Sequence, residues 1–269
     1  MNINIVSPWS IRHDHILRRM TDYLPWPVAE TPRCDALNYF VPYHFYADTD
    51  GPTATLFSHD VGNGQWARAA ERTDLRLAWT PLYTEPLSEH GPTRRVIPGL
   101  DQSAFSPNGH QETRPVVGVA GIVYGDGRKG EDLWARLVAE NGGRRDLRAI
   151  GQGWAGACKR IQYGEIPAYL RGLNVFLCCS RIEGVPYPPL EALACGVKVV
   201  IPRGVGLLDE LPDVPGIHRF DAGDYDDMCR ALTEALAARA DQQALRAAVA
   251  PYTWDAWVDS HLEAFEEWL

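Results

Sequence analysis

Two acidic residues, Glu183 and Glu191, flank a glycine- and proline-rich turn, with seven residues between them. The turn follows the apolar run of residues 175–179, which is typical of a buried parallel strand. Pro188 and Pro189 suit the first turn of a helix, where a missing N–H group costs little. Because this helix begins beyond the carboxyl end of a strand, its free N–H groups predict a site for an anionic ligand there.

An anionic ligand does not explain the two carboxylates, because like charges repel. We therefore interpret Glu183 and Glu191 as hydrogen-bond acceptors for sugar hydroxyls. Glu191 alone would be explained as a carboxylate that complements the dipole at a helix start, but the pair with this spacing favours a site. The helix is expected to end at Gly196, and a second apolar strand is expected over residues 197–201.

A second stretch combines a strand, a glycine-rich basic loop and a helix. We expect the strand over residues 115–121, the loop over residues 124–130 and the helix over residues 131–141. Backbone N–H groups, the helix dipole and the cation of Arg128 or Lys129 would together cradle a phosphate. The loop matches neither Gly-x-Gly-x-x-Gly nor a nucleoside-triphosphate P-loop, so this pattern alone is a weak signal.

Two shorter patterns occur in the first hundred residues. His59 follows an expected strand over residues 53–58 and precedes a glycine-rich loop, which is a good position to reach a ligand. A single histidine is nevertheless more often structural. Residues 48–50 match the Asp-x-Asp pattern of metal-dependent sugar transfer, but a Gly-Pro pair follows at once, so turn chemistry explains them better than a metal site.

Composition limits the class of protein. A length of 269 residues allows two modest domains, and a formal charge of -9 argues against a basic surface that binds duplex nucleic acid. The six cysteines form no Cys-x-x-Cys and no zinc-binding spacing, so we expect reduced thiols and a cytoplasmic protein. Residues 1–8 are too short and uncharged for a signal peptide, and no run of about 18 apolar residues could span a bilayer.

Strands and helices alternate on both sides of a polar, turn-rich stretch over residues 99–114. This alternation predicts two parallel-sheet domains that face each other and are joined by a linker. Beyond the linker, further strands are expected over residues 146–150 and 161–164, and helices over residues 166–171, 224–248 and 253–269.

Residues 180–186 and 190–200 resemble the Glu-x7-Glu signature of the family 4 glycosyltransferases, which have the GT-B fold. Three further segments resemble parts of the same family, so the resemblance covers most of the chain. They are the interdomain segment (residues 94–101, with Phe105 and Pro107 after it), the strand that ends in the active-site histidine (residues 55–60) and the start of the terminal helix (residues 252–254).

The resemblance implies an α/β protein of GT-B fold, with two facing, doubly wound, Rossmann-like parallel-sheet domains and a C-terminal helix that crosses back to the first. The acceptor-side domain would span residues 1–110, the nucleotide-sugar donor domain residues 111–252 and the helix residues 253–269. The implied activity is hexosyl transfer from a nucleotide-sugar with retention of anomeric configuration, with no metal or other cofactor. The acceptor stays open: a saccharide, a lipid-linked sugar, a small molecule or a modified nucleobase.

The resemblance also implies roles for individual residues. Glu183 would hold the hydroxyls of the donor sugar, Glu191 those of the ribose, and Lys129 the phosphates. His59 would orient or stabilise the donor sugar. The other implied residues are Arg128 as a second cation, Gly184, Val185 and Pro186 as backbone contacts to sugar and phosphate, and Arg160 and Ile161 as contacts to the base.

Two features depart from the family pattern. Ile122 stands where the family usually has an arginine, so Arg128 would supply the guanidinium from a longer loop. The first domain is short, and residues 8–14 replace the glycine-rich loop of the family. The alternatives are therefore a catalytically silent nucleotide-sugar-binding module, or the same chemistry on a modified base in DNA. Sugar-nucleotide epimerisation fits the Glu-x7-Glu signature less well.

Overall fold

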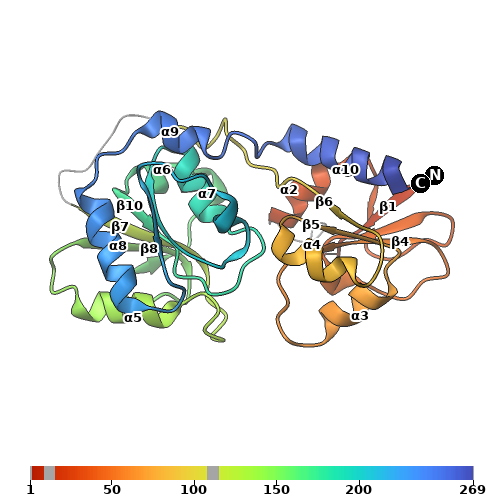
Figure 1. Cartoon of the computed structure of the whole chain (residues 1–269), viewed down its shortest axis with the longest axis horizontal. Helices are drawn as coiled ribbons and strands as arrows, with labels where there is room; N and C mark the ends of the chain where they lie inside the picture. The colour runs from red at the N-terminus through yellow and green to blue at the C-terminus, as the bar shows by residue number, and fades with distance from the viewer. Residues whose placement is uncertain (1, 9–15, 108–114, 269) are drawn as a thin grey trace. The chain divides into compact units, whose positions relative to one another are not determined.

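Two units make up the chain, whose structure is a computed structural model (Figure 1). Unit 1 comprises Met1–Gly99 with Tyr252–Leu269, and unit 2 comprises Leu100–Pro251. The predicted loop at residues 8–14 and the later part of the predicted linker fall largely outside the described residues. The structure describes residues 2–8, 16–107 and 115–268.

The segment that joins the units packs with unit 2, whereas the sequence places the boundary at residue 110. Arg246 holds this segment, because its guanidinium donates to the carbonyl oxygens of Gln102 at 2.9 Å and Phe105 at 3.3 Å. Arg171 donates to the carbonyl oxygen of Ser106 at 3.3 Å. The beginning of the linker is therefore an ordered part of unit 2.

Unit 1 is built on a six-stranded parallel sheet in the order β2-β1-β3-β4-β5-β6. The strands β1, β3, β4 and β5 are buried along their whole length, and most of their residues are apolar. The buried polar residues in these strands are Asn4, Asn38, Thr53, Thr55 and Arg76. The strands are β1 (Ile3–Val6), β2 (Val28–Ala29), β3 (Leu37–Phe40), β4 (Thr53–Phe57), β5 (Leu75–Ala78) and β6 (Thr93–Arg95). Among the described residues, the helices between these strands are α2 (Ile16–Asp22), the 3-10 helix η1 (Tyr43–Phe45), α3 (Gln65–Arg72) and α4 (Pro81–Ser88).

The last helix, α10 (Trp254–Trp268), belongs to unit 1 although it follows unit 2 in sequence (Figure 1). Trp257 is fully buried, and its indole N–H donates to the carbonyl oxygen of Met20 at 3.0 Å. Gly99 lies against the Trp254 ring so closely that no side chain fits there. The expected return of the C-terminal helix to the first domain is therefore confirmed.

His261 of α10 lies fully buried in the core of unit 1. Its Nε2 atom is 2.8 Å from the Tyr39 hydroxyl, and its Nδ1 atom is 2.7 Å from the carbonyl oxygen of Trp257. Burial lowers the pKa of His261 to about 3. The folded protein therefore keeps this imidazole neutral at a pH where an unfolded chain protonates it.

Above about pH 6.5, the pKa of an unfolded histidine, we expect the titration of His261 to add no pH dependence to the free energy of unfolding. Below that pH the unfolded chain binds a proton that the folded chain does not, so stability is lost at up to ~1.4 kcal/mol per pH unit. Urea unfolding of the wild type and of His261→Gln at about pH 7.5, 6 and 5 measures the slope. The variant should lose less stability on acidification; equal slopes in the two proteins would contradict this assignment.

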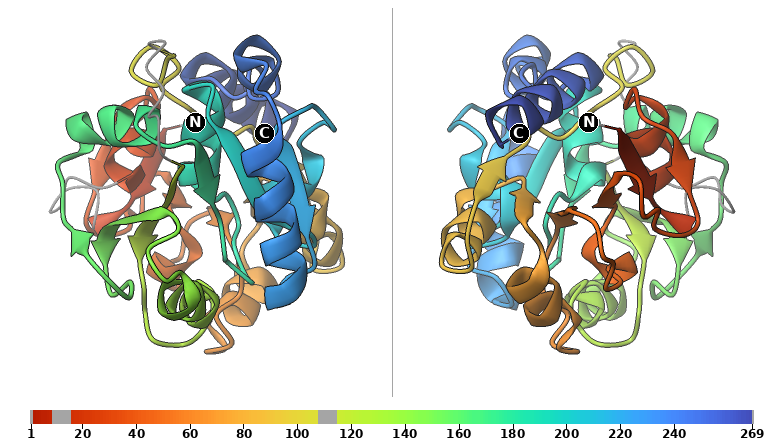
Figure 2. Two further views of the ribbon diagram at one scale, coloured as in Figure 1. Left: turned by 90° about the vertical axis from the view of Figure 1, so that its left-hand side faces the viewer. Right: turned by 90° about the vertical axis from the view of Figure 1, so that its right-hand side faces the viewer.

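Unit 2 contains a second six-stranded parallel sheet, in the order β12-β11-β10-β7-β8-β9 (Figure 2, left). Counted from its first strand, this is the order of the Rossmann fold, in which the chain changes its direction of winding between the first and fourth strands. That switch point lies here between β7 and β10. The strands are β7 (Val116–Ile122), β8 (Asp146–Gln152), β9 (Cys158–Lys159), β10 (Val175–Leu177), β11 (Lys198–Pro202) and β12 (Ile217–Phe220).

Helices cover both faces of this sheet (Figure 1). The apolar sides of α5 and α8 share one buried cluster with the strands, whereas α7 packs against α6 and against β10 and β11. The helices are α5 (Glu131–Glu140), η2 (Tyr163–Glu165), α6 (Ile166–Arg171), α7 (Tyr187–Ala194), η3 (Gly206–Glu210), α8 (Tyr225–Ala237) and α9 (Gln242–Ala247).

The predicted fold class, two doubly wound parallel-sheet domains, is confirmed. The strand predicted over residues 161–164 is wrong, because those residues lead into η2, and β9 ends at Lys159. The carboxylate of Glu165 accepts from the backbone N–H of Gln162 at 2.7 Å, which stabilises the start of this helix. No helix in the described ranges is both long and apolar enough to cross a membrane.

Candidate active site

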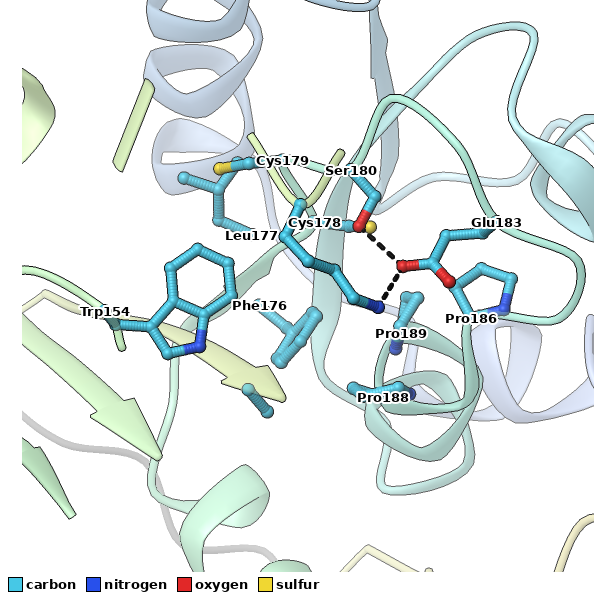
Figure 3. Close-up of a pocket in the computed structure, with 12 residues that line it drawn as sticks. Trp154, Phe176, Leu177, Cys178, Cys179, Ser180, Glu183, Pro186, Pro188 and Pro189 are labelled. Carbon is cyan, nitrogen blue, oxygen red and sulfur yellow. Dashed lines mark hydrogen bonds and ion pairs between the residues drawn. The ribbon is translucent and has the colours of Figure 1, made fainter. Parts of the chain in front are cut away.

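The loops that follow β7 and β10 meet at the switch point of unit 2, where parallel α/β sheets bind their ligands. Lys129 comes from the first loop and Glu183 from the second, and the Lys129 ammonium forms an ion pair with Oε1 of Glu183. The Ser180 hydroxyl donates to the same oxygen at 2.8 Å. The dashed lines in Figure 3 mark both contacts. The predicted phosphate cation and the predicted sugar carboxylate therefore lie together.

Glu183 is held from the backbone as well as through its side chain. Its residue is only 6% exposed, and the next carbonyl, that of Gly184, accepts from the backbone N–H of Leu207 at 3.0 Å. Gly206, at the start of η3, has a φ of 53° and lies against the carbonyl oxygens of Glu183 and Gly184. The turn that carries the Glu183 carboxylate therefore packs directly against the start of η3.

A pocket opens beside this ion pair. In Figure 3 the indole ring of Trp154 lies on the opposite side of the pocket from Glu183. The Trp154 N–H donates to the carbonyl oxygen of Gly121 at 3.0 Å, which fixes the ring. The pocket therefore has a charged end and an apolar wall. Its lining residues are Ala120, Lys129, Trp154, Phe176, Leu177, Cys178, Cys179, Ser180, Glu183, Pro186, Pro188 and Pro189.

The loop before α5 needs glycine to bring Lys129 to the pocket. Gly130, the residue before α5, has a φ of 65° and lies against the carbonyl group of Cys179, so any side chain there would collide with the backbone that follows β10. Gly127 also has a positive φ, of 79°. The glycine-rich loop predicted from the sequence therefore lets the two loops approach each other closely.

Arg181 fastens this loop to the segment after β10. Its backbone N–H donates to the carbonyl oxygen of Arg128 at 2.7 Å, and its guanidinium donates to the carbonyl oxygen of Gly127 at 2.8 Å. The same guanidinium forms two hydrogen bonds with Asp132, at 2.7 and 2.8 Å, and lowers the pKa of that carboxyl. Arg181 therefore fixes the position of Lys129 through the backbone.

Replacing Arg181 with alanine should loosen the loop that carries Lys129. We expect the KM for the substrate that this site binds to rise about 3- to 10-fold. The free energy of unfolding should fall by only about 1 kcal/mol, because the ion pair of Arg181 with Asp132 is partly exposed. The control is Arg136→Ala, which removes an exposed arginine of α5 that pairs with Glu140. An equal KM in Arg181→Ala and Arg136→Ala would contradict the positioning role; steady-state kinetics and thermal unfolding measure both effects.

The rest of the Glu-x7-Glu segment follows the predicted strand, turn and helix. Gly184 and Pro186 are buried, Val185 is half-buried, and Glu191 is 5% exposed on α7. The predicted helix end is confirmed: Gly196 has a φ of 73° and its N–H donates to the carbonyl oxygen of Leu193 at 2.9 Å.

Arg128 does not line the pocket that contains its neighbour Lys129. Its guanidinium lies 3.9 Å from the centre of the Tyr124 ring and 3.4 Å from a carboxylate oxygen of Asp126. Ile122, where the resemblance expects an arginine, is 42% exposed at the end of β7. The role of Arg128 as a substitute cation stays a prediction.

Three other predicted residues follow the ends of strands. Arg160 is exposed and hydrogen-bonds to the side chain of Gln152 at the end of β8, and Ile161 is half-buried. His59 belongs to unit 1, whereas the other predicted site residues belong to unit 2. It follows β4, and its backbone carbonyl accepts from the Tyr43 hydroxyl at 3.1 Å.

The Asp-x-Asp segment takes part in surface ion pairs. Asp48 pairs with Arg68 at 2.8 Å and with Arg72 at 3.0 Å, and these arginines lower the pKa of its carboxyl. Within the described parts of the chain, no group of three histidine, cysteine or acidic side chains is arranged to hold a metal ion.

Sequence reasoning left Ser180 and Trp154 out of the candidate site, although both line the pocket. Ser180 precedes Glu183 by three residues, a spacing that allows a side-chain contact across a turn. No comparable signal marks Trp154, because a tryptophan after a glycine-rich strand end is equally typical of a core residue and of a site residue.

Comparison with known proteins bears on both units. Residues 111–238 match the family model described as "Glycosyl transferases group 1", and this range contains the loops of Lys129 and Glu183. Among solved structures, sucrose-phosphate synthase from Thermosynechococcus elongatus superposes with a TM-score of 0.70 at 18% identity, covering 86% of this chain and 73% of that chain. HepE of Anabaena in complex with UDP-glucose gives a TM-score of 0.69 at 13% identity, covering 99% and 100%.

The fold is GT-B. A glycosyltransferase from Rickettsia africae is also similar, with a TM-score of 0.69 at 10% identity and coverage of 99% of this chain and 97% of that chain. A search of curated protein sequences finds no matching relative. At these identities the structural likeness concerns the GT-B fold, and membership of family 4 stays a prediction.

Proposed function

We propose that this chain is a retaining glycosyltransferase that moves a hexosyl group from a nucleotide-sugar to an acceptor. The observation that carries the proposal is the Lys129–Glu183 ion pair at the switch point of a sheet in the region that matches group 1 glycosyl transferases. A cation for phosphates and a carboxylate for hydroxyls, side by side, are the two groups that a nucleotide-sugar needs at its reacting end.

The chemistry divides between these groups. The bond between the anomeric carbon and the diphosphate breaks, and a new bond forms from the acceptor oxygen to that carbon. Lys129 would stabilise the negative charge that develops on the leaving nucleoside diphosphate, together with backbone N–H groups of the glycine-rich loop. The acceptor proton passes to the leaving diphosphate, so no general-base carboxylate is needed in this proposal.

Glu183 would accept hydrogen bonds from the hydroxyls of the donor sugar and so orient its anomeric carbon. In the structure this carboxylate pairs with Lys129, so donor binding would exchange part of that contact for contacts to phosphate and sugar. Ser180, whose hydroxyl donates to Glu183 at 2.8 Å, would keep the carboxylate in place during the exchange.

The remaining predicted residues complete the proposal. Glu191 would hold the ribose, and Arg160 and Ile161 would contact the base. Gly184, Val185 and Pro186 would present backbone to sugar and phosphate, with Arg128 as a second cation and His59 orienting the donor sugar. No metal is required in this scheme, because the ammonium group of Lys129 would stabilise the negative charge of the leaving diphosphate.

The test is incubation of the protein with UDP-, GDP- and ADP-sugars and a panel of acceptors, including hydroxymethylated DNA. Release of nucleoside diphosphate and transfer of labelled sugar are measured with and without EDTA, and proton NMR of the product gives its anomeric configuration. Slow donor hydrolysis that Glu183→Ala abolishes supports the proposal. Tight donor binding with no hydrolysis or transfer would favour a silent binding module, and label in DNA alone would identify the acceptor as a modified base.

A further inference from the structure

The hydroxyl of Tyr187 is buried and has no hydrogen-bond partner in the described parts of the chain. Tyr187 is the first residue of α7 and directly follows the backbone segment that the proposed function assigns to sugar and phosphate. An unpaired buried hydroxyl costs roughly 1–3 kcal/mol. A residue that keeps such a group beside a candidate site is a candidate ligand contact.

Tyr187 lies one helical turn before Glu191, and residues four apart lie on the same face of a helix. Burial raises the pKa of Tyr187 well above its usual value, and the nearby carboxylate of Glu191 and the phenol of Tyr163 raise it further. The phenol is therefore protonated throughout the working pH range and is a hydrogen-bond donor. A donor and a carboxylate acceptor thus share one face of α7.

Another buried tyrosine of the same unit shows the usual arrangement. The hydroxyl of Tyr169 lies 2.9 Å from the carbonyl oxygens of both Val119 and Arg148. Its hydrogen-bonding capacity is used within the protein. The Tyr187 hydroxyl differs, because it has no hydrogen-bond partner among the described residues.

We propose that Tyr187 and Glu191 together bind the ribose diol of the donor, and that Tyr187 is a specificity-determining residue of this site. The inference rests on the proposed function and adds a residue to it. The phenol donates to one ribose oxygen, and a hydroxyl of the same diol donates to the Glu191 carboxylate. A ribose satisfies both groups at once, because each of its hydroxyls both donates and accepts. A deoxyribose leaves one of them unsatisfied.

The test measures binding of UDP, GDP and ADP to the wild type by calorimetry, followed by the 2′-deoxy and 3′-deoxy forms of the diphosphate that binds best. Tyr187→Phe removes the phenol oxygen and little else. We expect it to weaken binding of the ribonucleoside diphosphate about 3- to 10-fold. One of the two deoxy forms lacks the ribose oxygen to which the Tyr187 phenol donates. We expect this form to bind the wild type and Tyr187→Phe almost equally, because the hydrogen bond is absent from both complexes.

The control is Tyr169→Phe, which removes a hydroxyl that is satisfied within the protein. This variant should lower the melting temperature and leave the Kd for the diphosphate unchanged. Tyr187→Phe that binds as tightly as wild type, with an unchanged or raised melting temperature, overturns the inference while the proposed function stands. If the wild type binds none of the three diphosphates, the proposed function fails, and this inference fails with it.

Discussion

Glu183→Gln is expected to reduce kcat/KM for sugar transfer by about 100-fold or more, a size usual for loss of a charged contact to the reacting group. Glutamine keeps the shape of the side chain and one acceptor oxygen, but it loses the charge that pairs with Lys129 and the second acceptor for sugar hydroxyls. The buried position of Glu183 makes the effect large, because little water reaches it to replace the lost contact.

The matched control is Glu140→Gln, which changes an exposed carboxylate of α5 in the same unit. That variant should keep its activity within a factor of about two, because an exposed ion pair contributes little. Activity is measured as release of nucleoside diphosphate in the presence of acceptor. If Glu183→Gln and Glu140→Gln retain equal activity, Glu183 does not contact the reacting sugar.

Lys129→Met tests the other half of the pair and should reduce nucleoside diphosphate binding about 10-fold or more, because it removes the cation. It also leaves Glu183 buried without its cation, so stability should fall by about 3 kcal/mol. The double variant with Glu183→Gln should recover part of that stability, because the two changes concern one contact and are not additive. Additive losses would contradict the ion pair as a unit.

The fold of unit 2 follows from its sequence to a large extent. The first four residues of β7 and the whole of β11 are buried, and both strands therefore appear in the sequence as largely apolar runs. Glycine marks the ends of the elements, as Gly196 does after α7, where its positive φ closes the helix. Local sequence therefore determines most of these elements and their order.

Elements whose stability comes from packing are harder to predict. Strand β2 has two residues and exists through its pairing with β1. Helix α3 is amphipathic but buries only Ala69 and Ala70, so no large apolar side chain marks its buried face in the sequence. Residues 161–164 have the branched and aromatic content of a strand, yet the capping contact between Gln162 and Glu165 turns them into a helix start.

The candidate site shows the same limit at the level of side chains. Arg128 and Lys129 are adjacent in a basic loop, and both carry the charge that a phosphate needs. Only the conformation of the loop sends Lys129 to Glu183 and Arg128 to Tyr124. Residue type predicts which chemistry is available, whereas the direction of a side chain depends on backbone angles that the sequence does not display.

Gly206→Ala should be a damaging small change at the turn that carries Glu183. A Cβ atom there would lie closer than 3.0 Å to the carbonyl oxygens of both Glu183 and Gly184, and the φ of 53° is itself unfavourable for alanine. The 3-10 helix η3 cannot easily retreat, because Arg219 donates to the carbonyl oxygens of Leu208 at 2.8 Å and Leu211 at 2.7 Å. The turn that carries Glu183 must therefore move.

Gly204→Ala is a matched control, because Gly204 has a φ of 73° and no heavy atom within 4 Å of its Cβ position. Each variant should lose about 1 kcal/mol through backbone strain. Gly206→Ala should lose about 2 kcal/mol more through overpacking, and its nucleoside diphosphate binding should weaken about 10-fold. Denaturant unfolding and calorimetry separate the two contributions. The difference between the variants isolates the contact under Glu183, because strain is common to both; equal losses would mean that η3 does not support the site.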